Sequence, residues 1–259
     1  MDSPSILTPY QSQYVAWLLS RRMAGDSADF LPPHIVDAQV DLNAHQIDAA
    51  LFAFENPLSK GVILADEVGL GKTIEAGLVI AQRWAERKRR ILIIVPANLR
   101  KQWHQKLQDK FSLQALILEV KNYNQLRKAG QSNPFDQTNC VIICSYQFAK
   151  SKADDLKRVP WQLAVIDEAH RLRNVYKPSN VIGKALKEAL AQAPKVLLTA
   201  TPLQNSLLEL YGLVSSVDER VFGDLSSFRD QFSALGNPDT FAKLRARLQT
   251  VCKRTLRRQ

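Results

Sequence analysis

Glycines, a lysine and a threonine meet in the run GVILADEVGLGKTIEAGLVI, which spans residues 61–80. An apolar stretch, residues 62–65, leads into a glycine-bearing turn, and an apolar-periodic segment follows Lys72 and Thr73. A strand, a glycine-rich loop and Lys-Thr at a helix start are typical of a phosphate-binding loop. Glycines let backbone N–H groups close around an anion, and the helix N-terminus adds partial positive charge. Lys72 then supplies a point charge, and Thr73 a hydroxyl that can bind Mg²⁺.

The strict form of this loop has glycine where this chain has Asp66. A bare Gly-Lys-Thr tripeptide also occurs by chance in surface turns, but the strand before it and the helix after it favour phosphate binding. We therefore predict that the loop binds a nucleotide through eight consecutive residues: Glu67, Val68, Gly69, Leu70, Gly71, Lys72, Thr73 and Ile74.

A second group of chemical residues lies in LAVIDEAHRLRN, residues 163–174. An apolar strand delivers Asp167 and Glu168 to its carboxyl end, where open parallel sheets place their ligands. One carboxylate can hold the Mg²⁺ that bridges the phosphates, while the other orients and deprotonates the attacking water. Acid pairs after strands also serve as plain N-terminal helix charges. Their position about 95 residues after a phosphate loop favours catalysis.

Hydroxyl groups follow a third apolar strand, in KVLLTATPLQN, residues 195–205. Thr199 and Thr201 at such a strand end can sense the γ-phosphate or the carboxylate pair. Their alternative role is ordinary turn capping.

The composition favours a globular protein with an acidic partner. Apolar residues make up 46% and charged residues 23% of the 259 residues, and the net charge is +10. Nucleic acid is the commonest acidic partner, although many basic proteins bind nothing acidic. No apolar run is long enough to span a bilayer, and the first residues lack a secretory pattern, so we expect no membrane partner and a cytoplasmic location. The three cysteines fit reduced structural thiols rather than a metal site.

Strand-like and helix-like segments alternate along the chain, which predicts an α/β fold with a mostly parallel sheet and helices on both faces. Strands are expected at 62–65, 91–95, 115–120, 140–145, 163–167 and 195–199. Helices are expected at 9–23, at 40–54 with Asn43 as the N-cap, and at 98–110, 122–129 and 181–192. Residues 1–39 would form a small helical N-terminal extension, and residues 40–259 the nucleotide-binding domain.

The motifs DEVGLGKTIEAG, VIDEAH and LTATPLQN, in this order, resemble the Swi/Snf family of superfamily-two ATPases, particularly its bacterial, RNA-polymerase-associated members. The resemblance runs from Leu42 to the C-terminus, and an aspartate at the position of Asp66 is usual in the family. It implies that the chain is the N-terminal RecA-like P-loop NTPase lobe of an ATP hydrolase, with ATP and Mg²⁺ as cofactors.

The resemblance also implies roles for single residues. Gln46 would read the adenine, and Lys72 would contact the β- and γ-phosphates. Thr73 and Asp167 would hold Mg²⁺, and Glu168 would activate the hydrolytic water. A further set would couple the nucleotide to the rest of the motor, with His170 linked to Thr199 and Thr201.

Double-stranded DNA is the partner that the resemblance implies. Arg100 and Lys101 begin a helix in IVPANLRKQWHQKL and would contact the DNA backbone, as would Ser145 and Tyr146 in ICSYQ. Trp103 is interpreted as a packing residue rather than a base-stacking one.

The family's motor needs a second RecA-like lobe that carries arginine fingers, and these 259 residues hold only one lobe. We therefore expect either a shortened chain or a part of a longer parent, and only weak activity from the isolated lobe. The expected function is Mg-ATP hydrolysis coupled to movement on double-stranded DNA, with RNA polymerase or a defence or restriction complex as further partners. The alternatives are a DEAH-type unwinding helicase, a restriction-system motor fragment and a non-catalytic nucleotide-binding module.

Overall fold

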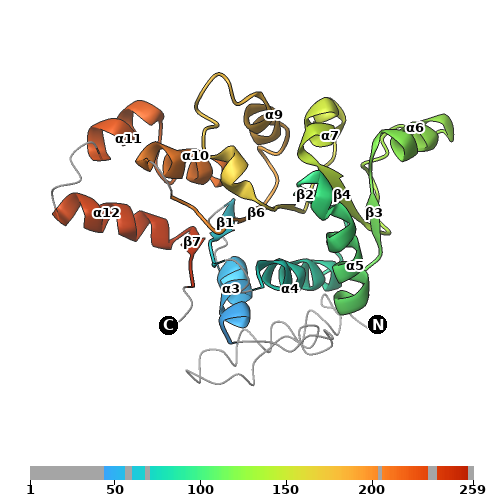
Figure 1. Cartoon of the computed structure of the whole chain (residues 1–259), viewed down its shortest axis with the longest axis horizontal. Coiled ribbons are helices and arrows are strands. Elements are labelled where there is room, and N and C mark those ends of the chain that lie inside the picture. Colours follow the sequence, from blue (N-terminus) through green and yellow to red (C-terminus); the bar gives the residue numbers. More distant parts are fainter. Residues whose placement is uncertain (1–43, 56–59, 68–70, 204–205, 233–237, 256–259) are drawn as a thin grey trace, which may run out of the picture.

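Within the residues that the structure describes, seven strands form one sheet in the order β3-β4-β2-β5-β6-β1-β7, and every neighbouring pair is parallel. The computed structural model describes residues 44–55, 60–67, 71–203, 206–232 and 238–255 (Figure 1). The strands are β1 (Gly61–Leu64), β2 (Ile91–Val95), β3 (Ala115–Ile117), β4 (Val141–Ser145), β5 (Leu163–Ile166), β6 (Lys195–Leu198) and β7 (Cys252–Lys253).

Both faces of the sheet are buried, which explains why the central strands β2 and β5 are apolar throughout. In β2, Ile91, Ile93 and Val95 contribute to one core, whereas Leu92 and Ile94 contribute to the other. Successive side chains of a strand point to opposite faces, so a run such as ILIIV satisfies both cores at once.

Helices cover both faces of the sheet (Figure 1). One layer consists of α3 (Ala44–Glu55), α4 (Lys72–Ala85) and α5 (Arg100–Phe111). The opposite layer includes α7 (Tyr146–Ser151), α9 (Val181–Ala189) and α10 (Leu207–Val217). The other described helices are α6 (Val120–Lys128), α8 (Ala153–Lys157), α11 (Leu225–Phe232) and α12 (Pro238–Gln249), with short 3₁₀ turns η2 (Ala97–Leu99) and η3 (Ala169–Leu172).

The predicted α/β fold with a parallel sheet between two helical layers is confirmed. The strand expected at 115–120 is too long, because Glu119 caps α6 through a reciprocal hydrogen-bond box with Asn122 and the helix begins at Val120. Helix α7 was not predicted; it begins directly after β4, where the Ser145 hydroxyl accepts a hydrogen bond from the backbone N–H of Phe148 at 3.3 Å. The expected helix at 9–23 and the N-cap Asn43 lie outside the described residues.

The cysteines are free thiols, as predicted. Cys144 is buried in β4, and burial raises the pKa of its thiol to about 12. Cys252 belongs to β7, a strand that the sequence did not indicate. Among the described residues, no helix combines the length and the apolar character that crossing a membrane requires.

Candidate nucleotide site

Three strands that are adjacent in the sheet carry the three predicted motifs. Asp66 follows β1, Thr199 follows β6 and Asp167 follows β5, and the sheet order is β5-β6-β1. The carboxyl ends of β1 and β6 are hydrogen-bonded to each other, because the backbone N–H of Thr199 donates to Leu64 O at 3.1 Å. Since carboxyl ends of parallel strands lie at one edge, segments over 100 residues apart in sequence meet there.

Lys72 stands at the first turn of α4, directly after Gly71. Gly71 has φ of 94°, a left-handed conformation that glycine adopts without strain. No side chain of the described residues caps this helix, so the first backbone N–H groups of α4 have no side-chain acceptor among them. The Lys72 ammonium donates to the backbone carbonyls of Asp66 at 2.7 Å and Glu67 at 3.1 Å. Because its partners in the described residues are neutral carbonyl oxygens, the ammonium is available to a stronger acceptor such as phosphate.

Gln46 lies on α3 and is 5% exposed. Its amide packs so closely on Gly71 that a Cβ added there would lie 2.2 Å from Gln46 Nε2. The predicted adenine reader is therefore in contact with the end of the loop, although its role toward adenine stays a prediction. Val68, Gly69 and Leu70 lie outside the described residues.

Asp66, the residue in place of the usual glycine, links the loop to the C-terminal segment. Its carboxylate accepts a hydrogen bond from the backbone N–H of Thr255 at 2.7 Å. Glu75 of α4 is fully buried beside it, and an imidazole nitrogen of His45 lies within 4.8 Å of both carboxylates. Burial, and then the charge of Asp66, raise the pKa of Glu75 to about 8. Glu75 in its protonated form can share its proton with Asp66, which avoids two adjacent buried charges.

The carboxylate of Asp167 is fixed by two donors. Trp103 Nε1 donates to Oδ2 at 2.8 Å, and the backbone N–H of Glu168 donates to Oδ1 at 2.8 Å. Burial raises the pKa of Asp167, opposed by these hydrogen bonds and by the charge of Lys72. The Tyr146 hydroxyl donates to the backbone carbonyl of Asp167 at 2.6 Å. Side chain and backbone of this residue are therefore both held in place.

The side chain of Glu168 is exposed, whereas that of the preceding Asp167 is buried. The backbone of Glu168 is left-handed, with φ of 52°, and its side chain is 41% exposed. The His170 Nδ1 atom lies 3.0 Å from Glu168 Oε2. The exposed carboxylate is thus oriented by the imidazole, while the buried Asp167 is oriented by the indole. The two acids have the separate environments that separate roles require.

The predicted link from His170 to the threonines is not seen in the structure; Arg173 makes the contact to Thr201 instead. The Arg173 guanidinium donates to the hydroxyl and the carbonyl of Thr201, and lies 3.7 Å from Glu209 of α10. The backbone N–H of Thr201 in turn donates to the hydroxyl of Thr199 at 3.3 Å. A chain of contacts therefore runs from the acid-pair segment through Arg173 to both threonines.

Gly212 permits α10 to approach the Arg173 segment closely. A Cβ added at Gly212 would lie 1.8 Å from the backbone carbonyl oxygen of Arg173, so no larger residue fits there without a shift of the backbone. Sequence reasoning missed Arg173, and the only signal was its position three residues after His170.

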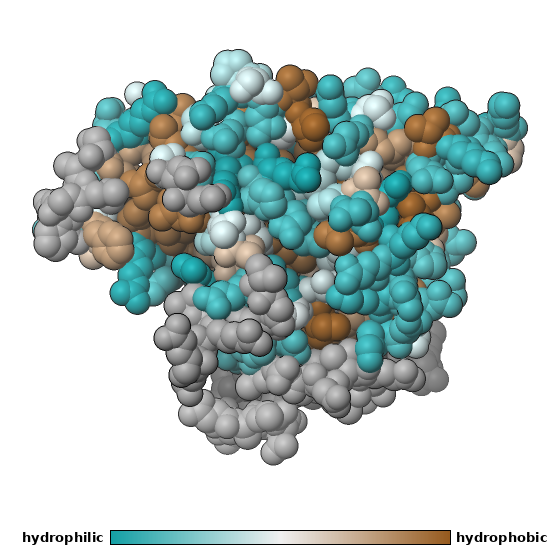
Figure 2. Space-filling view, viewed as in Figure 1, coloured by the Kyte–Doolittle hydropathy of each residue, from teal (hydrophilic) through white to brown (hydrophobic). Residues whose placement is uncertain are grey.

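The predicted nucleic-acid residues lie at the carboxyl ends of the strands as well, two of them after β2 and two at the end of β4. Arg100 donates to Ala97 O at 3.0 Å and to Glu119 Oε2 at 3.2 Å, and Lys101 beside it is exposed. A hollow of about 380 Å³ adjoins both residues. The surface over α5 is mainly hydrophilic (Figure 2). Ser145 and Tyr146 are buried and engaged inside the lobe, and their contact with nucleic acid stays a prediction.

A sequence profile of the SNF2-related domain matches residues 10–259. The chain belongs to the SNF2-related family. Curated relatives include the RNA polymerase-associated protein RapA of Stutzerimonas stutzeri, 37% identical over 74% of this chain, and that of Pseudomonas fluorescens, 39% identical over 72%. In both cases the match spans 20% of the relative, so this SNF2-related chain corresponds to one part of those proteins.

Solved structures confirm the fold of this SNF2-related domain as RecA-like. The Sulfolobus solfataricus SWI2/SNF2 ATPase core in complex with dsDNA superposes with a TM-score of 0.73 at 24% identity, over 86% of this chain and 46% of that chain. The ATPase core domain of the same organism gives 0.71 over 90% of this chain and 46% of that one.

The side chains of the SNF2-related site fit a magnesium nucleotide. No side chain of the described residues caps α4, and within these residues Lys72 donates to two backbone carbonyl oxygens. Thr73 and Asp167 offer the oxygen ligands that Mg²⁺ prefers. The nucleotide would be held by the loop and α4, and the ion by these two residues.

Proposed function

We propose that this chain is the ATP-binding lobe of a DNA-dependent Swi/Snf-type ATPase, whose Mg-ATP hydrolysis is coupled to movement along double-stranded DNA. The observation that carries the proposal is the convergence of Lys72, the acid pair and the threonines on the carboxyl ends of three adjacent strands. Family membership supports the reaction class.

The residues divide the reaction as follows. Lys72 leaves the carbonyl oxygens of Asp66 and Glu67 and binds the phosphates. Mg²⁺ held by Thr73 and Asp167 would neutralise charge on the phosphate oxygens. Glu168, oriented by His170, accepts the proton of the attacking water.

The chain from Arg173 to Thr201 and Thr199 joins the acid pair to α10 through Glu209. A change at the γ-phosphate would thus be transmitted to α10, which lies on the opposite face of the sheet from α4. His170 acts here on Glu168 rather than directly on the threonines.

Double-stranded DNA and a second RecA-like lobe are the partners that we propose. The net charge of +10 and the Arg100 and Lys101 edge support backbone contacts with DNA. The likeness to RapA proteins, which are named for their association with RNA polymerase, supports polymerase as a further partner.

Phosphate release measured from this chain alone, with and without duplex DNA, tests the proposal. Arginine fingers contribute about 10³–10⁵ in rate, and we propose that the second lobe supplies them. The chain alone should bind ATP but turn it over slowly, and a second lobe joined in cis should restore fast, DNA-stimulated turnover. Fast DNA-stimulated turnover by the chain alone, or none after the second lobe is added, would contradict it.

A further inference from the structure

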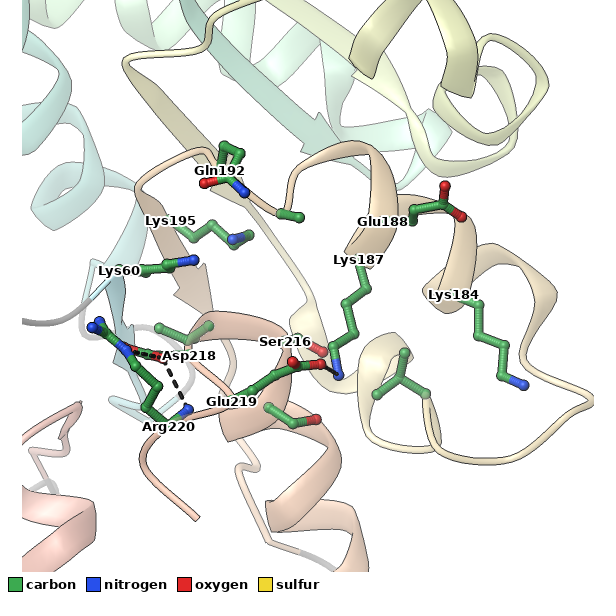
Figure 3. A pocket seen from close by; sticks show the side chains of 14 residues that line it. Lys60, Lys184, Lys187, Glu188, Gln192, Lys195, Ser216, Asp218, Glu219 and Arg220 are labelled. Atoms are coloured by element: carbon green, nitrogen blue, oxygen red, sulfur yellow. Dashed lines mark hydrogen bonds and ion pairs between the residues drawn. The ribbon is translucent and has the colours of Figure 1, made fainter. Parts of the chain in front are cut away.

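A second cavity lies at the amino ends of the parallel strands, where β1 and β6 begin, whereas the nucleotide site lies at their carboxyl ends (Figure 3). It has a volume of about 580 Å³ and lies between Lys60, just before β1, and the C-terminal ends of α9 and α10. Small-molecule sites commonly have volumes of about 300–1,000 Å³. A four-residue strand is about 13 Å long, so the cavity and the phosphate loop lie at separate ends of β1.

Positive charge dominates the lining of this cavity. Five cationic side chains and three carboxylates line it. The carboxylates already have cationic partners: Asp218 pairs with Arg220 at 2.7 Å, Glu219 with Lys187 at 2.7 Å, and Glu188 with Lys157 outside the cavity at 2.8 Å. In the described part of the chain, no ion pair joins the three remaining cations to a carboxylate; these are Lys60, Lys184 and Lys195.

Lys195 is the most unusual of these cations, because its side chain is buried at 4% exposure. Its ammonium donates to the backbone carbonyl of Ala193 at 3.1 Å. Burial, and then the charge of Lys60, lower the pKa of Lys195 to about 8, and the charges of Asp218 and Glu219 oppose this shift only in part. Figure 3 shows Lys195 and Lys60 side by side with both ammonium groups directed into the cavity, and the amide of Gln192 above them. A buried charge beside a like charge is costly unless an anion joins them.

We propose that this cavity binds a small phosphate-bearing anion, held between the ammonium groups of Lys195 and Lys60. A phosphate group carries about −1.5 to −2 charge near pH 7, which matches two unpaired cations better than a single carboxylate does. The cavity exceeds the size of a phosphate ion, so there is room for a small molecule that carries the phosphate. Gln192 offers amide hydrogen-bonding groups to it.

The site is independent of the nucleotide site. The two lysines proposed to hold the anion come from the amino ends of β1 and β6, the other two lysines of the lining from α9, and the acids from residues 188, 218 and 219. None of these residues belongs to the phosphate loop or the acid pair. Loss of nucleotide binding would therefore leave this site intact, and loss of anion binding here would leave the nucleotide site intact.

The experiment follows the Lys195 side chain by NMR in protein with ¹³C-labelled lysine, in a Lys72→Ala background so that phosphate cannot report on the phosphate loop. The probes are inorganic phosphate and glycerol 3-phosphate. Bound phosphate should raise the pKa of Lys195 from about 8 toward its ordinary value. Each unit of that rise corresponds to roughly tenfold tighter binding to the charged lysine. Tighter binding of glycerol 3-phosphate identifies a phosphomonoester site, and equal binding identifies a phosphate site; both support the proposal.

Two variants complete the test. Lys195→Met removes the buried charge, and Lys60→Met removes an exposed one whose loss leaves the core intact. Calorimetry compares their phosphate affinities, because Lys195→Met lacks the NMR reporter. Each should weaken phosphate binding roughly tenfold or more, whereas Lys150→Met, at an exposed lysine on α7, should not. The proposal is overturned if phosphate leaves the pKa of Lys195 unchanged. It is also overturned if all three variants bind phosphate with equal affinity. A response of Lys195 to a polyglutamate peptide but to neither phosphate probe also overturns it, in favour of a protein partner.

Discussion

A lysine lies at each end of the parallel strands, in contrasting surroundings. Lys72 is at the side where the strands end, here called the carboxyl edge, and Lys195 is at the side where they begin, the amino edge. At the carboxyl edge, Lys72 stands at a helix start and donates to two carbonyl oxygens, with the carboxylate of Asp167 near enough to feel its charge. At the amino edge, Lys195 is buried beside the cation Lys60 and donates to one carbonyl. The first lysine is balanced by acids and can move to an incoming phosphate. The second forms no ion pair in the described residues, and the carboxylates of Asp218 and Glu219 offset only part of its charge.

The contrast shows how a site can be present without a sequence motif. The loop around Lys72 is continuous in sequence, so its strand, glycines and helix start indicate it directly. The amino-edge cavity combines Lys60, Lys195 and the end of α10, each of which alone is an ordinary surface pattern. Only the sheet order, with β6 next to β1, brings them together.

The largest effect is expected at the carboxyl edge. In a protein that carries both lobes, Glu168→Gln should lower ATP hydrolysis by about 10²–10⁴-fold, because a general base contributes about that much. Nucleotide affinity should stay unchanged. Phosphate release measures the first quantity and calorimetry the second. Glu188→Gln at the amino edge is the matched control, and equal hydrolysis by the Glu168 and Glu188 variants would refute the assigned role.

The next effect is a pH dependence that belongs to the amino edge. Lys195 has a pKa of about 8 in the folded chain, below its ordinary value of 10.5. Between these two values the unfolded chain binds more protons, so the free energy of unfolding should rise as pH increases from 8 to 10.5. The depressed pKa corresponds to a penalty on the order of 3 kcal/mol below pH 8.

Lys195→Met should remove both the penalty and this rise, so the variant should be more stable than wild type at pH 7. Denaturant unfolding at several pH values measures the difference, and Lys150→Met serves as the exposed control. Parallel stability curves for wild type and Lys195→Met would show that Lys195 does not titrate as proposed.

The third effect separates the two lysines directly. Lys72→Ala should weaken binding of Mg-ADP by about 10- to 100-fold, because a hydrogen bond to a charged group contributes about 1.5–3 kcal/mol. Lys195→Met should leave it unchanged. Calorimetry with ADP and Mg²⁺ compares the two variants. Equal losses in both would mean that the two edges are coupled rather than independent.

The parts of the site that follow local pattern were predictable, and the parts that depend on distant contacts were not. The strand at 91–95 was predicted with the bounds that the structure has, because five apolar residues satisfy two cores. The three motifs were predicted at one edge, since strands in a parallel sheet end together. Trp103 was interpreted as a packing residue, which its burial confirms, but its bond to Asp167 joins residues 64 apart in sequence.

The features that the sequence did not predict depend on contacts between residues far apart in the chain. The bond from Thr255 to Asp66 spans 189 residues and depends on β7 lying beside β1. A two-residue strand is too short for any periodicity to reveal. Arg173 was overlooked because an arginine in a charged loop is usually solvated, whereas here α10 buries it.

The smallest effect concerns the surface around Arg100 and Lys101. Binding to duplex DNA should be independent of sequence and should weaken with salt, with a log–log slope of roughly −0.9 per phosphate neutralised. Replacement of both residues by alanine should flatten the slope by up to about 1.8, and Lys110→Ala at the other end of α5 should change it less. Arg100 is already paired with Glu119 at 3.2 Å, so it must leave that carboxylate to bind a phosphate.

Such exposed pairs are worth only about 0–1 kcal/mol, which makes the exchange feasible and its net contribution small. Glu119→Gln should accordingly strengthen DNA binding by a few-fold at low salt, because it frees Arg100 and removes a negative charge from the same surface. Fluorescence anisotropy with duplexes of unrelated sequence, over a range of salt concentrations, measures all of these variants. A sharp preference for one duplex, or a slope that survives the double alanine replacement, would place the DNA on another face of the lobe.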